Sequence, residues 1–217
     1  MIVDLNLHGK TVVVIGGGNE AQKRINSLLK QDCDILIISD SVNSQINKLV
    51  KAKKIKLKKQ KIQDTKFISK FKPNIIITTA NDKKLNQKII NSAKRKNIIV
   101  YSSDNPEDSD FSNPAIIDFE NMIQIAIFTG GRSPAMSKKI RIQSEKIFKK
   151  IITKEDIAQI KIQQIARKLA KQSIHNQTQR KKYLHNIMTD KGIEQLIKDG
   201  QLKKAERQAI TILRKWK

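Results

Sequence analysis

The amino-acid sequence predicts an α/β protein: a parallel sheet with helices on both faces, followed by a β-hairpin and an all-helical C-terminal part. Up to about residue 115, short apolar runs alternate with longer stretches of helical periodicity, a pattern typical of parallel strands covered by helices. Two strand-like runs follow, and from Ser133 onward the periodicity is helical. All four prolines lie between Pro73 and Pro134, which places a change of architecture in the same region.

The strands and helices of the first region follow from the residues in chain order. Runs rich in isoleucine and valine predict parallel strands, and the amphipathic stretches predict the helices that connect them. The predicted strands are 11–16, 34–39, 54–59, 74–80 and 97–102, and the predicted helices are 19–31, 42–52 and 82–96. The next runs, 115–119 and 122–128, flank a polar corner at Glu120 and Asn121 and predict a hairpin.

Start and stop signals divide the helical region. Ser133 is a predicted N-cap with Pro134 at the first helical position, and Thr153 with Asp156 predicts a capping box. Gly200 predicts a stop between two short helices. Two apolar stripes are expected to face a core: Ala158, Ile162, Ile165 and Leu169, and Leu202, Ala205, Ala209 and Ile212. The change of architecture near residue 115 therefore predicts two units.

Charge and cysteine content narrow the functional classes. The 217 residues include 44 Lys and Arg against 20 Asp and Glu, a formal net charge of +24. This excess predicts attraction to a nucleic acid, an anionic membrane surface or a substrate with many carboxylates, although a solvated lysine-rich surface explains it equally well. Cys33 is the only cysteine, so an internal disulfide or a cysteine metal cage is excluded. Without a signal-peptide pattern or an apolar run near ~20 residues, we expect a cytoplasmic protein with no membrane span.

A glycine-rich turn follows the first predicted strand. In VVVIGGGNEAQKR, the residues Gly16, Gly18 and Ala21 form a G-x-G-x-x-A pattern, which lets the backbone approach a pyrophosphate at a helix N-terminus. Asp40 ends the next strand, about twenty residues on, where a carboxylate binds ribose hydroxyls. Because it would repel a ribose phosphate, NAD is favoured over NADP. An alternative interpretation of the glycine motif is a tight strand-to-helix turn in another doubly wound domain, without dinucleotide binding.

The segment TTAND, residues 78–82, follows the fourth predicted strand and is expected beside the nicotinamide half of the cofactor. For Asn81 itself we predict a helix N-cap. Together the two segments predict a Rossmann-type NAD site. Its predicted residues are Gly16, Gly18, Asn19, Glu20, Ala21, Asp40, Thr79 and Ala80.

Four carboxylates lie within seven positions after the fifth predicted strand. Asp104 comes first, at the edge where ligands of α/β sheets collect, and could accept a proton or touch a metal ion. We assign most of Glu107, Asp108 and Asp110 to solvent or to local turn bonds.

A second glycine-rich segment, IFTGGRSPAMSKKIR, follows the hairpin. Thr129, Gly130 and Gly131 expose backbone N–H groups that could hold an anion, with Arg132 alongside and Ser133 at the helix start. For each of these residues the alternative is that it only forms the start of the helix. The two adjacent glycines favour anion binding.

In combination, four segments resemble the precorrin-2 dehydrogenases of sirohaem synthesis, many of which are also sirohydrochlorin ferrochelatases. The segments are DLNLHGKTVVVIGGGNEAQKR, IIITTANDKKLNQKI, IIVYSSDNPEDSDFSNPAIID and IAIFTGGRSPAMSKKIR. They cover roughly residues 4–141, in the order and spacing usual for the family, whereas residues 150–217 carry no matching motif.

The resemblance implies a homodimer with three parts: an NAD-binding Rossmann domain at 1–115, a dimerisation region at 116–150 and a helical C-terminal domain at 151–217. It implies NAD-dependent oxidation of precorrin-2 to sirohydrochlorin, followed in bifunctional members by insertion of ferrous iron. Asp104 in YSSD matches the family's N-V-V-D-type aspartate, which is regarded as important for both steps. TGGRSP matches its G-G-x-S-P stretch, so the implied substrate-binding residues are Thr129, Gly130, Gly131, Arg132 and Ser133. The chain departs from the family at Ser102 and Ser103, where apolar residues are more usual.

The implied chemistry accounts for both the basic surface and the acidic loop. Precorrin-2 bears eight carboxylates, which Arg132 and nearby lysines could bind. Oxidation requires removal of a proton as the hydride leaves, and chelation requires removal of two pyrrole protons; Asp104 is the predicted general base for either. No resident metal site is predicted, because a chelatase should hold its metal loosely. We expect His8, His175 and His185 to be structural or exposed.

Two other functions stay open. A non-catalytic module that senses NAD or a nucleotide would use the same fold and would not require Asp104. A nucleic-acid binder could use the basic tail LKKAERQAITILRKWK with Trp216. Because aromatic residues make up only 4% of the chain and offer few stacking platforms, we expect no nucleic-acid partner.

Overall fold

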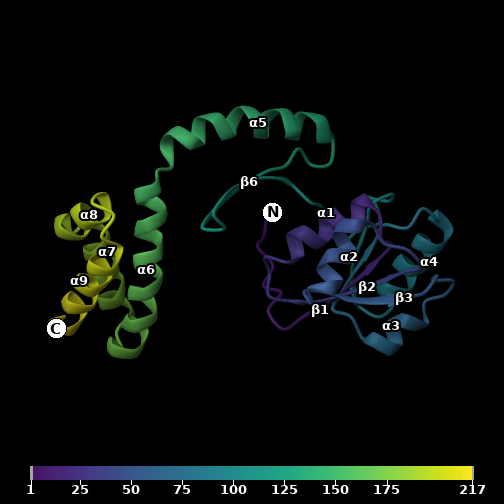
Figure 1. Ribbon diagram of the computed structural model, residues 1–217, viewed down its shortest axis with the longest axis horizontal. Helices are drawn as coiled ribbons and strands as arrows, with labels where there is room; N and C mark the ends of the chain where they lie inside the picture. Colours follow the sequence, from purple (N-terminus) through teal and green to yellow (C-terminus); the bar gives the residue numbers. More distant parts are fainter. Residues whose placement is uncertain (1, 217) are drawn as a thin grey trace. The chain divides into compact units, whose positions relative to one another are not determined.

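The computed structural model describes residues 2–216 and divides the chain into two compact units, one ending at Pro114 and one beginning at Ala115 (Figure 1). Each unit has its own hydrophobic core and is described separately. Of the helices in the described residues, none is both long and apolar enough to cross a membrane.

The first unit is a five-stranded sheet in the order β3-β2-β1-β4-β5, with all neighbouring strands parallel. Its elements are β1 (Thr11–Ile15), α1 (Asn19–Leu28), β2 (Asp34–Ser39), α2 (Ser44–Lys51), β3 (Lys56–Lys59), α3 (Lys66–Phe71), β4 (Ile75–Thr78), α4 (Lys83–Lys94) and β5 (Ile99–Ser102). The chain runs outward from β1 to β3 and then returns to β4 on the other side of β1. This reversal places a topological switch point between β1 and β4, where α/β proteins bind ligands.

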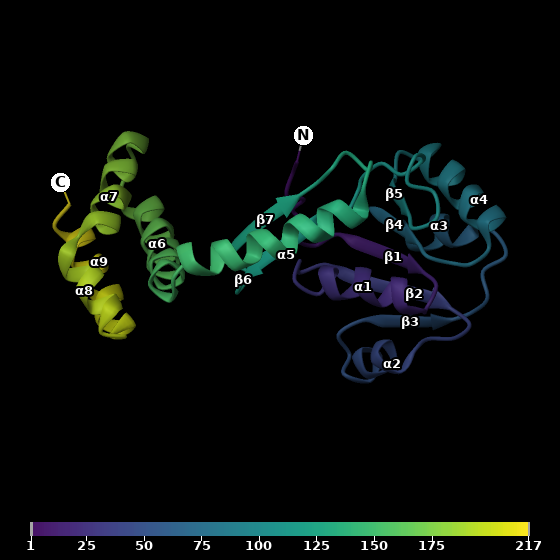
Figure 2. The same ribbon diagram turned by 90° about the horizontal axis from the view of Figure 1, so that it is seen from above.

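Alternation along β1 explains why helices cover both faces of the sheet (Figure 2). Val12 and Val14 belong to a core cluster with Ala21 and Ile25 of α1, and Val13 belongs to a second cluster with side chains of α3 and α4. Successive side chains of a strand point to opposite faces, so a continuous apolar run suits a strand that is buried on both sides. The predicted α/β fold class is therefore confirmed.

One element of this unit was not predicted. Residues 66–71 form the short helix α3, which buries Phe67 and Ile68 against the sheet. Six residues are too few for a helical period to emerge from the sequence. The helix ends at Lys72, which has a left-handed backbone with φ of 45°.

The start of α4 corrects the predicted cap. The N-cap is Asp82, whose carboxylate accepts a hydrogen bond from the Leu85 N–H at 3.0 Å. The prediction that Asn81 caps this helix was wrong by one residue. Asparagine and aspartate are both good N-cap residues. Because α4 begins at Lys83, Asp82 occupies the cap position.

The second unit begins with an antiparallel hairpin of β6 (Ala115–Phe119) and β7 (Ile123–Ile127). Glu120 and Asn121 form its corner with φ values of 53° and 57°. The helices that follow are α5 (Pro134–Ile151), α6 (Lys154–Ser173), α7 (Gln177–Thr189), α8 (Lys191–Lys198) and α9 (Leu202–Arg214).

The predicted helix boundaries of this unit are confirmed. Ser133 caps α5 with Pro134 in the first turn, and Thr153 forms a reciprocal capping box with Asp156. Gly200, with φ of 70°, separates α8 from α9. The helical core is built around side chains of α6 to α9: Ala158, Ile162, Ala166, Ala170, Tyr183, Ile187, Ile193, Ile197, Ala205, Ala209 and Leu213.

The predicted stripe of α9 needs one correction. Leu202 is 39% exposed, whereas Leu213 is buried in the core. Ala205, Ala209 and Leu213 follow one another at intervals of four residues and carry the buried face, so Leu202 at the first turn lies at its margin.

Candidate dinucleotide site

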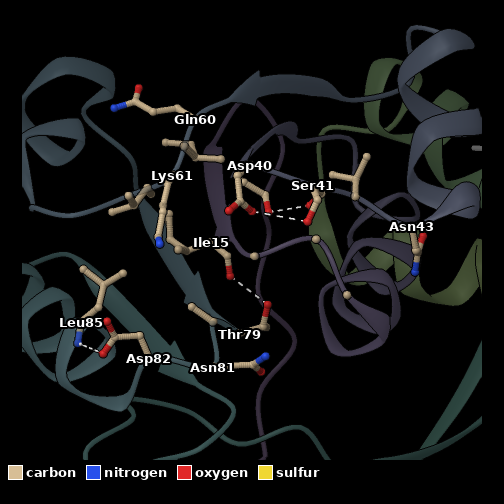
Figure 3. A pocket seen from close by; sticks show the side chains of 18 residues that line it. Ile15, Asp40, Ser41, Asn43, Gln60, Lys61, Thr79, Asn81, Asp82 and Leu85 are labelled. Atoms are coloured by element: carbon tan, nitrogen blue, oxygen red, sulfur yellow. Dashed lines mark hydrogen bonds between the residues drawn. The ribbon is translucent and has the colours of Figure 1, made fainter.

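A cavity of about 590 Å³ opens at the carboxyl edge of the sheet, at the switch point between β1 and β4 (Figure 3). It is lined by the ends of β1 and β2 and by the loops that follow β1, β2, β3 and β4. Five residues that the sequence predicts at a cofactor site line this cavity: Gly16, Gly18, Asp40, Thr79 and Ala80.

The three glycines after β1 serve different purposes. Gly16 has φ of +106°, and an added Cβ would lie 2.6 Å from the Thr79 hydroxyl oxygen. A Cβ on Gly17 would lie 2.1 Å from the backbone oxygen of Ser41. A Cβ on Gly18 would meet no protein atom within 4 Å. The fold therefore requires the first two glycines, and the third leaves open space on the cavity wall.

The N-terminus of α1 begins at this open space. Gly18 is the N-cap, and no side chain makes a capping hydrogen bond there. The first N–H groups of a helix have no partner within the helix, and the helix dipole favours an anion beside them. A pyrophosphate fits both observations, because it would accept these hydrogen bonds in the space that Gly18 leaves free.

Side chains from the loop after β3 were not predicted at this site: Gln60 and Lys61 line the cavity together with Asp40 (Figure 3). Asn81 and Asp82 also line it, and both belong to the segment 78–82 that the sequence predicts beside the nicotinamide half of the cofactor. A parallel sheet places the loop after every strand at the same edge, but which of these loops lie beside the cavity depends on the strand order.

Three predicted cofactor residues are absent from the cavity lining. Ala21 is fully buried against the sheet. Glu20 accepts a hydrogen bond from Lys23 at 2.8 Å, which lowers the pKa of its carboxyl. Asn19 accepts a hydrogen bond from Asn43 at 3.4 Å. Direct contact of these residues with a cofactor stays a prediction, although Ala21 provides the close helix-to-strand packing that the motif requires.

Asp104 lies two residues beyond the end of β5 and is exposed, outside the lining of the cavity. Its Oδ1 atom accepts hydrogen bonds from Ser102 Oγ at 2.5 Å and from Asn86 Nδ2 at 3.0 Å. Asn86 Nδ2 also donates to the carbonyl oxygen of Ala80 at 2.8 Å, and Asn86 Oδ1 accepts from the Thr78 hydroxyl. A chain of hydrogen bonds therefore connects Asp104 to a residue of the cavity wall.

The other acids of this loop organise the loop itself. Asp108 accepts hydrogen bonds from Gln87 at 3.1 Å and from Asn105 at 2.9 Å, and these bonds lower the pKa of its carboxyl. Asp110 accepts a hydrogen bond from the Val100 N–H at 2.8 Å. The bonds to α4 and β5 reach further along the chain than the local turn bonds that the sequence suggested.

In the second unit, the Thr129 hydroxyl accepts from the Ser133 N–H at 3.2 Å and donates to the Ser133 carbonyl at 3.1 Å. Gly130 and Gly131 have φ values of 65° and 76°, and Arg132 is exposed. These bonds close the loop onto the start of α5. The structure thus shows how this loop leads into α5. Anion binding by Gly130, Gly131 and Arg132 stays a prediction.

Within residues 2–216, no group of three or more His, Cys, Asp or Glu side chains is placed to hold a metal ion. His8 pairs with Asp32 at 2.8 Å on the surface.

The doubly wound sheet and the glycine-lined cavity at its switch point define a dinucleotide-binding α/β domain. A family model described as putative NAD(P)-binding matches residues 3–115. The chain belongs to this family of NAD(P)-binding proteins.

Curated relatives of the chain are siroheme synthases. The protein of Actinobacillus pleuropneumoniae serotype 7 (strain AP76) is 26% identical over 202 residues, covering 93% of this chain and 40% of that protein. The protein of Baumannia cicadellinicola subsp. Homalodisca coagulata is 27% identical, covering 94% of this chain and 42% of that protein. The chain thus spans about 40% of the length of these relatives.

A solved structure shows the same fold along the whole chain. The precorrin-2 dehydrogenase SirC matches with a TM-score of 0.71 at 20% sequence identity, and all of each chain is covered. The likeness includes the hairpin and also the helical part after residue 150, where the sequence contained no matching motif.

Proposed function

We propose that this protein oxidises precorrin-2 to sirohydrochlorin with NAD as hydride acceptor, in sirohaem biosynthesis. The main support for this proposal is that the dinucleotide cavity and Asp104 lie at the same edge of the sheet. Hydrogen bonds from Asn86 connect Asp104 to Ala80 of the cavity wall. The similarity to siroheme synthases and to a precorrin-2 dehydrogenase supports the same substrate class.

Residues of the cavity would hold the cofactor. The N-terminus of α1 at Gly18 would bind the pyrophosphate, and Asp40 would accept hydrogen bonds from the ribose hydroxyls. Asp40 also favours NAD over NADP, since its carboxylate would repel a 2′-phosphate. Bound NAD supplies the nicotinamide ring that accepts a hydride.

Asp104 would accept the proton that leaves precorrin-2 during the oxidation. Every hydrogen bond that the described part of the chain makes to this carboxylate ends on Oδ1. Oδ2 therefore keeps its lone pairs for a substrate proton. Insertion of ferrous iron, as a substrate, would use the same carboxylate to remove pyrrole protons and stays a prediction.

The basic surface would attract the carboxylates of the tetrapyrrole. Arg132 and the N–H groups around Gly130 and Gly131 are the proposed contacts, since the positive φ of both glycines exposes backbone there.

The second unit also offers a surface for the proposed homodimer. Four exposed apolar side chains on α5 are spaced by four, seven and four residues, which places them along one side of the helix. They are Met136 at 45%, Ile140 at 37%, Ile147 at 59% and Ile151 at 61% exposure, whereas Ile142, also exposed, lies on another side. Exposed apolar side chains that share one side of a helix are typical of a subunit contact.

The decisive experiment mixes the purified protein with precorrin-2 and NAD and follows NADH by absorbance. We expect turnover by the wild type and a fall of about 10²–10⁴-fold for Asp104→Ala, the usual contribution of a general base. Glu107→Ala is the matched control, because it removes an exposed carboxylate of the same loop.

The alternative, a module that only senses the dinucleotide, makes the opposite prediction. Wild-type protein that binds NAD without forming NADH would favour the sensor, whereas Asp104→Ala turnover equal to that of an active wild type would refute the role of Asp104 as general base. Adding ferrous iron after the oxidation is complete then tests sirohaem formation separately.

A further inference from the structure

A cluster of buried polar side chains lies next to Asp104, at the ends of β4 and β5. Thr78 and Ser102 are fully buried, and Asn86 on α4 is 1% exposed. Burying a hydroxyl or an amide is unfavourable unless its hydrogen bonds are made. Apolar side chains would fill the same positions without that requirement. The cluster therefore needs an explanation beyond packing.

Two hydrogen bonds of the cluster end on the same atom, Asp104 Oδ1. Ser102 Oγ and one N–H of the Asn86 amide both donate to Asp104 Oδ1, and the other N–H of Asn86 donates to the Ala80 carbonyl. Thr78 donates to the Asn86 oxygen, so both N–H groups and the oxygen of that amide are occupied. Such an amide cannot rotate without losing several bonds at once, which makes it a rigid support.

We propose that Ser102 and Asn86 are positioning residues that hold Asp104 by its Oδ1 atom and present Oδ2 to the substrate. This inference rests on the proposed function, in which Asp104 accepts the substrate proton. A free aspartate samples several rotamers, and two donors on one oxygen select a single orientation of the carboxylate.

The same amide fixes the carboxylate relative to the cavity. Ala80 lines the cavity, and its carbonyl and the Asp104 carboxylate bind the two N–H groups of one Asn86 side chain. The separation between them is therefore set by the geometry of a single planar group. Proton acceptance beside a nicotinamide ring requires such a defined separation, because misplacement by about 1 Å reduces rates by about 10²-fold.

The test compares Ser102→Val with Ser102→Thr. Both add a methyl group at a fully buried position, and they differ in that only threonine retains the hydroxyl. We expect kcat for precorrin-2 oxidation to be about tenfold lower in Ser102→Val than in Ser102→Thr, the effect of one charge-assisted hydrogen bond. The KM for precorrin-2 and the Kd for NAD should agree within about twofold between the two variants, because Ser102 is fully buried and does not line the cavity.

Equal kcat in the two variants, with an active wild type, would overturn the positioning role. A joint change in KM, NAD affinity and melting temperature in the valine variant would also overturn it, since that pattern reports a structural role. Ser102→Ala, which removes the hydroxyl without adding volume, provides the second comparison and should repeat the loss in kcat. Wild-type protein that forms no NADH would instead refute the proposed function itself.

Discussion

Alanine at Gly17 and alanine at Gly18 should have opposite consequences, although the two glycines are adjacent. The new Cβ at Gly17 would lie 2.1 Å from the backbone oxygen of Ser41 and 2.8 Å from the Cα of Val42. Both contacts are with backbone, which cannot move aside as a flexible side chain does. The new Cβ at Gly18 would have no neighbour within 4 Å and would point into open space.

The expected magnitudes differ accordingly. Overpacking costs about 1–3 kcal/mol, and contact with rigid backbone places Gly17→Ala near the upper end. At about 4 °C per kcal/mol, the first unit should melt about 10 °C lower. For Gly18→Ala, a slightly poorer N-cap and the lower entropy of the unfolded chain nearly cancel, so the melting temperature should hardly change. A methyl group against the pyrophosphate should weaken NAD binding by about 10–100-fold.

Two measurements separate these effects. Circular dichroism follows the unfolding of the whole chain, and calorimetry measures the Kd for NAD. Trp216 is the only tryptophan and lies in the second unit, so its fluorescence is an internal control that neither substitution should alter. Wild-type NAD affinity in Gly18→Ala would refute the assignment of the pyrophosphate to this loop. Wild-type melting in Gly17→Ala would refute the packing argument.

Three further predictions concern charge and burial. Asp40→Asn should raise the affinity for NADP relative to NAD by about tenfold, measured by calorimetry, because it removes the carboxylate that repels a 2′-phosphate; an unchanged ratio would remove Asp40 from the ribose site. Tyr183 is fully buried, and its hydroxyl donates a hydrogen bond at 3.0 Å within the helical core, so Tyr183→Phe should cost about 1 kcal/mol of unfolding free energy, measured by Trp216 fluorescence. Burial raises the pKa of Tyr183 above its ordinary 10.0, so wild-type stability should fall as the pH rises past 10.0 and the variant should lack this loss. Hydrogen bonds from Gln87 and Asn105 lower the pKa of Asp108 below 3.8, so the stability that Asp108→Asn loses at neutral pH should shrink towards zero as the pH falls below 3.8 in acid titrations followed by circular dichroism.

Strands β1, β2, β4 and β5 could be predicted because their runs of isoleucine and valine are apolar on both faces, whereas the lysine-rich β3 contains no such run. Val12 and Val13 pack on opposite sides of the sheet, so the run carries no alternation and indicates a strand covered by helices. Helix α3 could not be predicted, since Phe67 and Ile68 are its only buried residues and two neighbouring positions do not define a helical period.

Part of the cavity followed from local patterns. Gly16, Gly18 and Asp40 belong to a motif whose spacing reflects one strand, one turn and one helix, so the sequence alone brings them together. Gln60 and Lys61 reach the same cavity only because β3 pairs with β2 in a parallel register. Strand order depends on packing of the whole unit, and no local pattern encodes it.

The sequence of α4 nevertheless indicated that Asn86 has hydrogen-bond partners inside the protein. Asn86 lies three, four and seven residues before Ile89, Ile90 and Ala93, all of which are buried, so it occupies the apolar stripe of the helix. A polar residue within an apolar stripe must find its partners inside the protein, because no water reaches it. The partners here are a backbone carbonyl, a threonine hydroxyl and the carboxylate of Asp104. A polar interruption in the apolar stripe of a helix that follows a ligand-binding loop therefore indicates a side chain that supports the site.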